Sequence, residues 1–294
     1  RVDVARHPTS PLLFMTGPYQ ASTVGSSGRA VVVTRSPLTD LYIDTYIGGN
    51  IGHVLRQAGW DGLFITGASE HLCRLEIVDG CAELHEASAL QGMTTWQVEQ
   101  ALDDKGECLS IGPAGEHGIR IASPLTAGRR AAGRGGTGAA FGFKNLKAVT
   151  VKSTTKEKVR FASEASLKSA IKVQRQEMGL RRRSGDPFYA FGTSRGPIYA
   201  SANGRMPTAN YSSTNAMIPA FSELKVSGGQ GGVVPATGTA VTITTKLDAH
   251  ELSGEHWHES LPDAKQSACC APCPIACEAA DRPTIDGKKI RKRP

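Results

Sequence analysis

The residues best suited to chemistry are four cysteines that lie close together near the end of the chain. They are Cys269, Cys270, Cys273 and Cys277, and the 294 residues contain seven cysteines in all. Cys270, Cys273 and Cys277 have the spacing C-x2-C-x3-C, which lets one short loop present three thiolates to a single iron–sulfur cube while a fourth ligand comes from elsewhere. Adjacent residues rarely direct both side chains at one centre, so Cys269 is left out of this set. The spacing favours an iron–sulfur cluster.

Two other chemistries fit the same cysteines. His256 and His258 lie upstream, so a zinc site built from histidine and cysteine is stereochemically allowed. Cys270 and Cys273 also have the C-x2-C spacing of a redox-active dithiol. The spacing leaves both alternatives open behind the iron–sulfur cluster. The remaining cysteines are scattered, and we expect them to be small buried side chains: Cys73, Cys81 and Cys108.

A second run of the sequence interleaves glycine with arginine. Arg129, Arg130 and Arg134 stand among several glycines between residues 128 and 142. Glycine lets backbone N–H groups approach an anion closely, and arginine binds phosphate through two hydrogen bonds. The run lacks the ending of a Walker loop and does not form the G-x-G-x-x-G pattern. It therefore indicates a phosphate or pyrophosphate site of another kind, with tight turns in a β-rich domain as the alternative.

Two further glycine-rich segments precede this run, at residues 16–29 and 47–52. Each segment alone is typical of a turn. Together the three segments indicate that several stretches of backbone come very close to one large ligand. A cofactor that carries phosphate groups is the simplest such ligand.

The elements that must position these residues are mostly strands in the first half of the chain. Short runs rich in Val, Ile and Thr between turn residues predict strands: 30–34, 63–66, 75–78, 108–111, 119–122 and 148–151. Apolar residues at helical spacing predict helices at 49–57 and 94–103. Ser163 is a suitable N-cap for a helix that runs to about Arg181. Residues 192–238 show no clear period, and we expect loops there.

This pattern predicts the α+β class and two domains. A β-sheet-rich cofactor-binding domain is expected over residues 1–152, followed by the start of a mainly helical domain over residues 153–294 that carries the cysteine loop. The length is enough for two modest domains that each bury a core.

Composition and charge exclude several classes of protein. The formal net charge is +7, but much of the excess lies at residues 181–183 and 288–293, which we expect to be solvated, so nucleic acid is not an expected partner. No apolar run approaches the roughly 20 residues that span a bilayer. The chain starts without Met and without an apolar h-region, so we expect a cut edge rather than a signal peptide. The expected compartment is the cytoplasm, where cysteines more often bind metals than form disulfides.

Four blocks of the sequence resemble the aldehyde:ferredoxin oxidoreductase family, in the family's order. They are residues 17–70, 110–122, 128–152 and 270–277. The resemblance implies an N-terminal domain of β-sheets that holds a tungsten bis-pyranopterin, with molybdenum as the alternative metal, followed by mainly helical domains. It also implies a Mg²⁺ ion that bridges the pterin phosphates.

The resemblance assigns cofactor-binding roles to nine positions, which agree with the phosphate sites indicated by glycine and arginine. They are Arg29, Tyr46, Gly48, Gly49, Arg130, Ala131, Gly133, Arg134 and Gly135. Tyr46 departs from the family, which commonly has Asn there. The family's magnesium contact at that position uses a backbone carbonyl.

The resemblance further implies electron transfer. Cys270, Cys273 and Cys277 match the first three ligands of the family's [4Fe–4S] cluster. The family oxidises an aldehyde, with water, to a carboxylic acid, and electrons pass through the cluster to ferredoxin. A small aldehyde and ferredoxin are thus the implied substrate and partner, and a homo-oligomer stays open.

Family members are longer than this chain, and their second half supplies the fourth cluster cysteine and the acidic and histidine residues beside tungsten. We therefore expect the active site to be incomplete here, with the catalytic residues unassigned. The chain is expected to be a fragment or a subunit that needs a C-terminal partner chain. The alternatives are a non-enzymatic zinc or iron–sulfur binding module and a degenerate remnant of the family.

Overall fold

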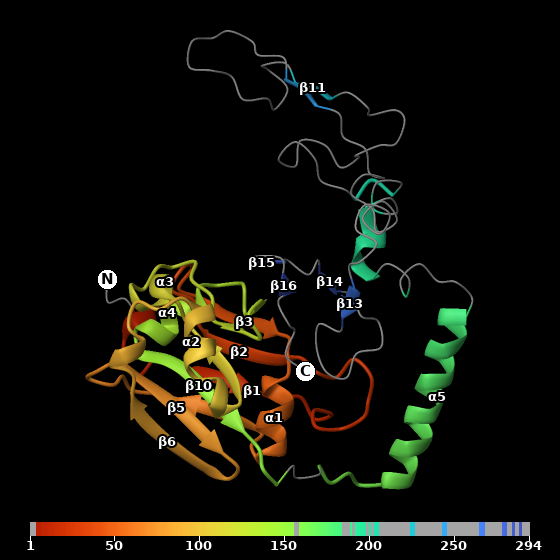
Figure 1. The fold of residues 1–294 in the computed structure, drawn as a ribbon, viewed down its shortest axis with the longest axis horizontal. Helices are drawn as coiled ribbons and strands as arrows, with labels where there is room; N and C mark the ends of the chain where they lie inside the picture. Colours follow the sequence, from red (N-terminus) through yellow and green to blue (C-terminus); the bar gives the residue numbers. More distant parts are fainter. Residues whose placement is uncertain are drawn as a thin grey trace. The chain divides into compact units, whose positions relative to one another are not determined.

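The first half of the chain forms two β-sheets with short helices around them (Figure 1). A computed structural model describes residues 4–155, 159–183, 189, 192–197, 200 and 203–205, with short strands at 224–226, 243–245, 265–267, 278–280, 284–285 and 288–289. The chain divides into two compact units, and the first contains the described residues up to Gln176.

The first sheet is antiparallel and has the strand order β3-β2-β1-β4. Its strands are β1 (Leu12–Met15), β2 (Ala30–Arg35), β3 (Tyr42–Ile47) and β4 (Gly62–Ile65). Buried and half-buried side chains alternate along β1 and β2, because successive side chains point to opposite faces of a sheet. β3 lies at one edge, which is the edge that faces the glycine- and arginine-rich segment.

The second sheet has the order β6-β5-β10-β7-β8-β9. Its strands are β5 (Cys73–Val78), β6 (Cys81–Glu86), β7 (Glu107–Ser110), β8 (Leu125–Thr126), β9 (Arg130–Ala131) and β10 (Leu146–Lys152). β10 pairs in parallel with β5 and antiparallel with β7. Six of its seven residues are buried, as expected for a strand covered on both faces.

Both sheets share one hydrophobic core. Phe14 and Val32 of the first sheet belong to the same buried cluster as Leu109 and Val149 of the second. The short helix α1 (Ile51–Gln57) adds Ile51 and Leu55 to this cluster. The two sheets are therefore held together directly by apolar burial.

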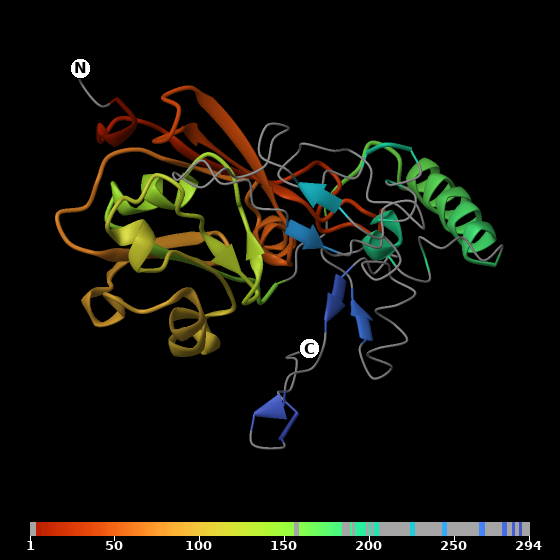
Figure 2. The ribbon, with the colours of Figure 1, turned by 90° about the horizontal axis from the view of Figure 1, so that it is seen from above.

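The other helices up to residue 183 are short apart from the last, part of which belongs to the second unit. They are α2 (Thr95–Ala101), α3 (Pro113–Glu116), α4 (Thr137–Gly142) and α5 (Glu164–Arg183), with the 3-10 turns η1 (Val4–Arg6), η2 (Ser88–Leu90) and η3 (Asp103–Lys105). Thr94 caps α2 with a capping box, because its hydroxyl accepts from the N–H of Gln97 and the Gln97 side chain accepts from the N–H of Thr94. Ser163 accepts from the N–H of Ser166 at 3.2 Å at the start of α5. Figure 2 shows α5, in green, as one unbroken helix.

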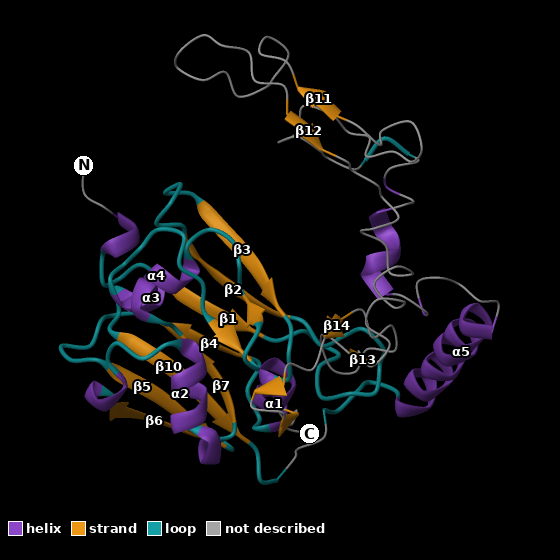
Figure 3. Cartoon of the chain, turned by 45° about the horizontal axis from the view of Figure 1, so that its top comes forward, coloured by secondary structure: helices purple, strands orange, loops and turns teal. Residues whose placement is uncertain are grey.

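The expected α+β class with a sheet-rich first part is confirmed (Figure 3). One expected strand is wrong, since residues 119–122 form a turn after α3. The amides of Ile119 and Ala122 donate to Ala114 and Ile119, so local turn bonds replace a strand ladder. The alternating Ile119 and Ile121 are exposed rather than half-buried.

Beyond the first unit, the structure describes isolated elements. They are η4 (Gly192–Arg195) and three antiparallel pairs: β11 (Leu224–Val226) with β12 (Ile243–Thr245), β13 (Lys265–Ser267) with β14 (Glu278–Ala280), and β15 (Thr284–Ile285) with β16 (Lys288–Lys289). Most of the expected helical domain lies outside the described residues. Within the described ranges, no helix combines the length and the apolar character needed to cross a bilayer.

A buried ion pair fixes α3 to the second sheet. Lys147 of β10 is fully buried, and its Nζ donates to a carboxylate oxygen of Glu116 and to the carbonyl oxygen of Met93 at 2.8 Å. Glu116 also accepts from the N–H of Gly92 at 2.9 Å. Helix α3 in turn packs closely on α4, because a Cβ added at Gly142 would collide with the carbonyl of Gly115. The ion pair thus sets the position of α4.

Breaking this ion pair is expected to destabilise the first unit. In Glu116→Gln, Lys147 stays buried without a countercharge, which costs about 3–5 kcal/mol of unfolding free energy. Adding Lys147→Met removes the uncompensated charge and should recover much of that loss. Urea denaturation followed by circular dichroism measures both variants. Simply additive losses in the double variant would contradict the pairing.

The stabilising contribution of the turn between β5 and β6 is expected to decrease at acidic pH. Asp79 accepts from the hydroxyl of Thr154 at 2.6 Å and from its N–H at 2.8 Å, and these bonds lower the pKa of Asp79 from 3.8 to about 2. The unfolded chain binds this proton more readily, so the stabilisation is complete above the unfolded pKa and is lost as the pH falls through 3.8 towards 2. Urea midpoints between pH 5 and pH 2 should fall more steeply for the natural protein than for Asp79→Asn. Parallel curves would refute the assignment.

Candidate cofactor site

Three segments that are distant in sequence meet at the edge strand β3. Arg29 directly precedes β2, and Gly48 directly follows β3. Because Ala30 pairs with Ile47, the antiparallel register places Arg29 beside Gly48 at the same end of the hairpin. Tyr46 lies within β3, and its side chain is 58% exposed.

The third segment is residues 127–136, here called the Gly–Arg loop, which includes the short strand β9 and contacts β3 at Arg134 and Gly135. At its start, a Cβ added at Gly49 would lie 3.2 Å from Cγ2 of Thr126 and 3.7 Å from Cγ of Arg130. Further on, the N–H of Arg134 donates to the hydroxyl of Thr45 at 3.4 Å. The structure therefore brings together Gly49, Arg130 and Arg134, which the sequence separates by up to 85 positions.

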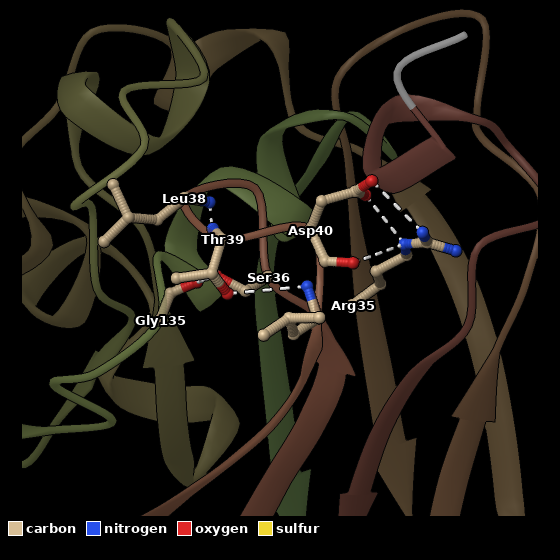
Figure 4. Close-up of polar contacts among 7 residues, drawn as sticks. Arg35, Ser36, Leu38, Thr39, Asp40 and Gly135 are labelled. Carbon is tan, nitrogen blue, oxygen red and sulfur yellow. Dashed lines mark hydrogen bonds and ion pairs between the residues drawn. The ribbon is translucent and has the colours of Figure 1, made fainter. Parts of the chain in front are cut away.

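The end of the Gly–Arg loop is held by the turn between β2 and β3. The hydroxyl of Ser36 donates to the carbonyl oxygen of Gly135 at 2.7 Å, and it accepts from the N–H groups of Leu38 and Thr39. Figure 4 shows this contact and the fork of two hydrogen bonds by which Arg35 binds the carboxylate of Asp40. The pair of Arg35 and Asp40 thus closes the turn, and Ser36 attaches it to the Gly–Arg loop.

Glycine is required where the Gly–Arg loop touches β3. Gly135 has φ +72°, and a Cβ added there would collide with the side chain of Ile43. Gly133 is different, since a Cβ at that position would meet nothing within 4 Å. The backbone at Gly133 therefore faces open space, which is what a ligand that contacts main-chain groups needs.

The site is rich in positive charge. Arg29 and Arg134 are exposed and form no ion pair with a carboxylate in the part of the chain that the structure describes. Next to Gly49, the side chain of Asn50 donates to Glu107 at 3.3 Å. Burial raises the pKa of Glu107, against the opposing effect of this hydrogen bond. An anion bound here would be attracted by the arginines.

The loop that leads to Arg29 is fastened by side chains from outside it. Nδ1 of His53 accepts from the N–H of Ala21 at 3.1 Å, and burial lowers the pKa of His53. The imidazole is therefore neutral at pH 7, with its proton on Nε2. The side-chain amide of Gln174 accepts from the N–H of Gly25 at 2.9 Å and donates to its carbonyl at 3.3 Å.

The residues present fit a cofactor held through its phosphate groups. Glycine backbone that faces open space and arginine side chains bind phosphate oxygens well. Among the described residues, no group of three or more His, Cys, Asp or Glu side chains is arranged to hold a metal ion.

The cysteine predictions have mixed outcomes. Cys270, Cys273 and Cys277 lie outside the described residues, so their assignment stays a prediction. Cys73 and Cys108 are buried, as expected, whereas Cys81 is exposed, which corrects that expectation. Cys81 opens the edge strand β6, most of whose side chains face solvent. Burial, together with the charge of Glu99, raises the pKa of Cys108 to about 12, which keeps its thiol protonated.

The nine residues predicted to bind a cofactor lie in β3 or just after it, directly before β2, or in the Gly–Arg loop. The sequence did not point to Ser36 and Thr45, which attach the Gly–Arg loop. Thr45 lies on the buried side of a strand, where threonine is ordinary. Ser36 stands in a turn, where serine is equally common. Only the fold distinguishes them.

Comparison with known proteins finds a matching family model. Residues 2–153 match the family model described as the aldehyde ferredoxin oxidoreductase N-terminal domain. A tungsten-containing aldehyde ferredoxin oxidoreductase of Pyrococcus abyssi is 34% identical over 209 residues, which are 69% of this chain and 34% of that protein. A protein of the same description from Pyrococcus furiosus is 28% identical over 284 residues, 95% of this chain and 41% of that protein. The chain thus spans well under half the length of these relatives.

One solved structure shares the fold. It is the active site complex BamBC of benzoyl coenzyme A reductase in complex with 1,5 dienoyl-CoA, with a TM-score of 0.60 and 21% identity. The match covers 97% of this chain and 40% of that chain.

The glycine at position 135 is expected to be needed for stability, unlike its neighbour at position 133. Gly135→Ala introduces a left-handed alanine that also collides with Ile43, which should lower the unfolding free energy by about 2 kcal/mol. Gly133→Ala is the matched control and should change it by less than about 0.5 kcal/mol. Equal effects in thermal unfolding would contradict the close approach of the loop to β3.

Proposed function

The chain belongs to the aldehyde ferredoxin oxidoreductase family through its N-terminal domain, and from this premise we propose that it binds the phosphates of a tungsten bis-pyranopterin. Arg29, Gly48–Gly49 and the Gly–Arg loop would form the binding site. The observation that carries the proposal is the meeting of these separate glycine and arginine segments along one edge of the first sheet.

Each part of the site has a distinct task in this proposal. Arg29, Arg130 and Arg134 neutralise the phosphate charges, with two hydrogen bonds from each guanidinium. Gly133, whose backbone faces open space, would let main-chain groups reach the ligand, while Gly49 and Gly135 allow the close packing that holds the loop. A Mg²⁺ ion would bind the backbone carbonyl oxygen of Tyr46. The presence of Tyr in place of the family's Asn would not affect this contact, because the side chain is not the ligand. Mg²⁺ prefers such oxygen ligands.

The cysteine loop would hold a [4Fe–4S] cluster. The spacing of Cys270, Cys273 and Cys277 supports this assignment. A fourth ligand is required from another part of the protein. The cluster would carry electrons from the metal–pterin centre to ferredoxin.

The proposed reaction converts an aldehyde and water into a carboxylic acid, two protons and two electrons. Two molecules of oxidised ferredoxin would each accept one electron. The tungsten centre supplies the oxygen-transfer and redox chemistry when it is bound. The described residues of this chain bind and orient the cofactor, and the residues that act on the aldehyde are expected outside them.

The proposal is tested by the metal and pterin content of the anaerobically purified protein. Arg134→Gln removes a phosphate contact, which should weaken cofactor retention about tenfold or more. Arg175→Gln, which changes an exposed arginine of α5 that is not among the residues proposed to bind the cofactor, is the matched control and should retain the cofactor. Elemental analysis gives tungsten and molybdenum, and fluorescence after oxidation gives pterin.

Two outcomes would overturn the proposal. Absence of both metals and of pterin, even after expression with a partner that supplies the rest of the family's length, would contradict cofactor binding. Stoichiometric zinc without the visible absorbance of an iron–sulfur cluster would favour the non-enzymatic zinc module instead.

A further inference from the structure

Two buried hydroxyl groups hold the Gly–Arg loop at consecutive residues. Thr45, 5% exposed, accepts from the N–H of Arg134, and Ser36, fully buried, donates to the carbonyl oxygen of Gly135. These bonds hold the N–H at the start and the carbonyl oxygen at the end of the Arg134–Gly135 dipeptide. They come from two different parts of the β2–β3 hairpin, 89 and 99 positions away along the chain.

The hydroxyl of Ser36 has little freedom to bond elsewhere. Its oxygen accepts from Leu38 at 3.1 Å and from Thr39 at 3.2 Å. A hydroxyl has two acceptor lone pairs and one donor hydrogen, so its proton is left for the carbonyl of Gly135, 2.7 Å away. The donor direction is therefore set by the turn.

The turn itself is closed by hydrogen bonds. The guanidinium of Arg35 binds the carboxylate of Asp40 at 2.7 and 3.1 Å. Within the turn, the N–H of Ser36 donates to the carbonyl oxygen of Leu41 and the N–H of Asp40 donates to that of Ser36, both at 2.8 Å. Ser36 thus fixes the carbonyl oxygen of Gly135 relative to strands β2 and β3.

Arg134 lies between the two attachment points. Its own N–H is bonded to Thr45, and the residue that follows it is held by Ser36 and by the tight contact with Ile43. The Arg134 side chain therefore starts from a backbone that is already ordered. Ordering a loop before the ligand arrives reduces the entropy lost on binding.

We propose that Ser36 and Thr45 are positioning residues for phosphate binding by the Gly–Arg loop. They act through the backbone of Arg134 and Gly135 and do not touch the ligand. The inference rests on the proposed function, since it assumes that this loop binds the phosphates of a cofactor. It adds two residues that neither the sequence pattern nor the family assignment indicates.

The test measures binding of inorganic pyrophosphate with Mg²⁺ to the full chain by titration calorimetry. Ser36→Ala and Thr45→Val each remove one attachment, and both should weaken binding about threefold to tenfold, the range of one neutral hydrogen bond. Thr45→Ser keeps the acceptor oxygen and should bind like the natural protein.

The matched control is Thr34→Val in β2. Thr34 is also buried, and its hydroxyl donates to the carbonyl of Pro11 at 2.8 Å, away from the Gly–Arg loop. This variant should lose thermal stability as Ser36→Ala does while keeping its affinity for pyrophosphate. A purely structural role for Ser36 would make the two variants alike in both measurements.

The outcomes distinguish failure of the phosphate site from failure of the positioning role. If the natural protein does not bind pyrophosphate, the phosphate site itself is overturned. If it binds, and Ser36→Ala and Thr45→Val bind as tightly as Thr34→Val, only the positioning role is overturned. Should Ser36→Ala fail to fold, Thr45→Val decides, because valine and threonine have nearly the same shape.

Discussion

The contact between the Gly–Arg loop and the edge strand β3 is the constraint on which the rest of the site depends. It requires a left-handed glycine at position 135, where any side chain would collide with Ile43. It requires a second glycine at position 49, where the start of the loop comes within van der Waals distance. With these residues in place, arginines from two segments, Arg29 and the Gly–Arg loop, lie near the same edge of the sheet.

Support for this contact comes from both sheets. The first sheet supplies β3 and the turn that carries Ser36. The second sheet fixes α3 through the buried pair of Lys147 and Glu116, and α3 in turn packs against α4, which follows the loop directly. The shared core joins the two sheets, so the loop is anchored at both of its ends. Burial of the charged pair is tolerated because each group is satisfied by further hydrogen bonds.

The sequence was enough to predict the fold class and most strands of the core, while the cofactor-binding roles of individual residues stay a prediction. Val31 and its neighbours in β2 have the β-branched composition of a strand, and Thr94 has the spacing of a capping box, so both could be found locally. The turn at residues 119–122 could not, because its alternating isoleucines imitate a strand and only the bonds to α3 decide. The roles of Ser36 and Thr45 depend on partners far along the chain, which no local pattern contains. The roles predicted for the cysteines depend on their spacing alone.

In the proposal, the described residues of this chain position the cofactor and do not take part in the redox reaction. The described residues form a site suited to the phosphates of a large cofactor, and they contain no cluster suited to binding a metal directly. In the proposal, these residues position the cofactor through backbone and arginine contacts, and the cofactor supplies the redox chemistry.

The central claim is that β3 and the Gly–Arg loop form one phosphate site, and amide chemical shifts test it most directly. Pyrophosphate with Mg²⁺ is titrated into ¹⁵N-labelled protein while the backbone signals are followed. The account predicts shifts that saturate together at Gly48, Gly49, Arg134 and Gly135. Shifts confined to the basic cluster at residues 181–183, with those four signals unmoved, would contradict it.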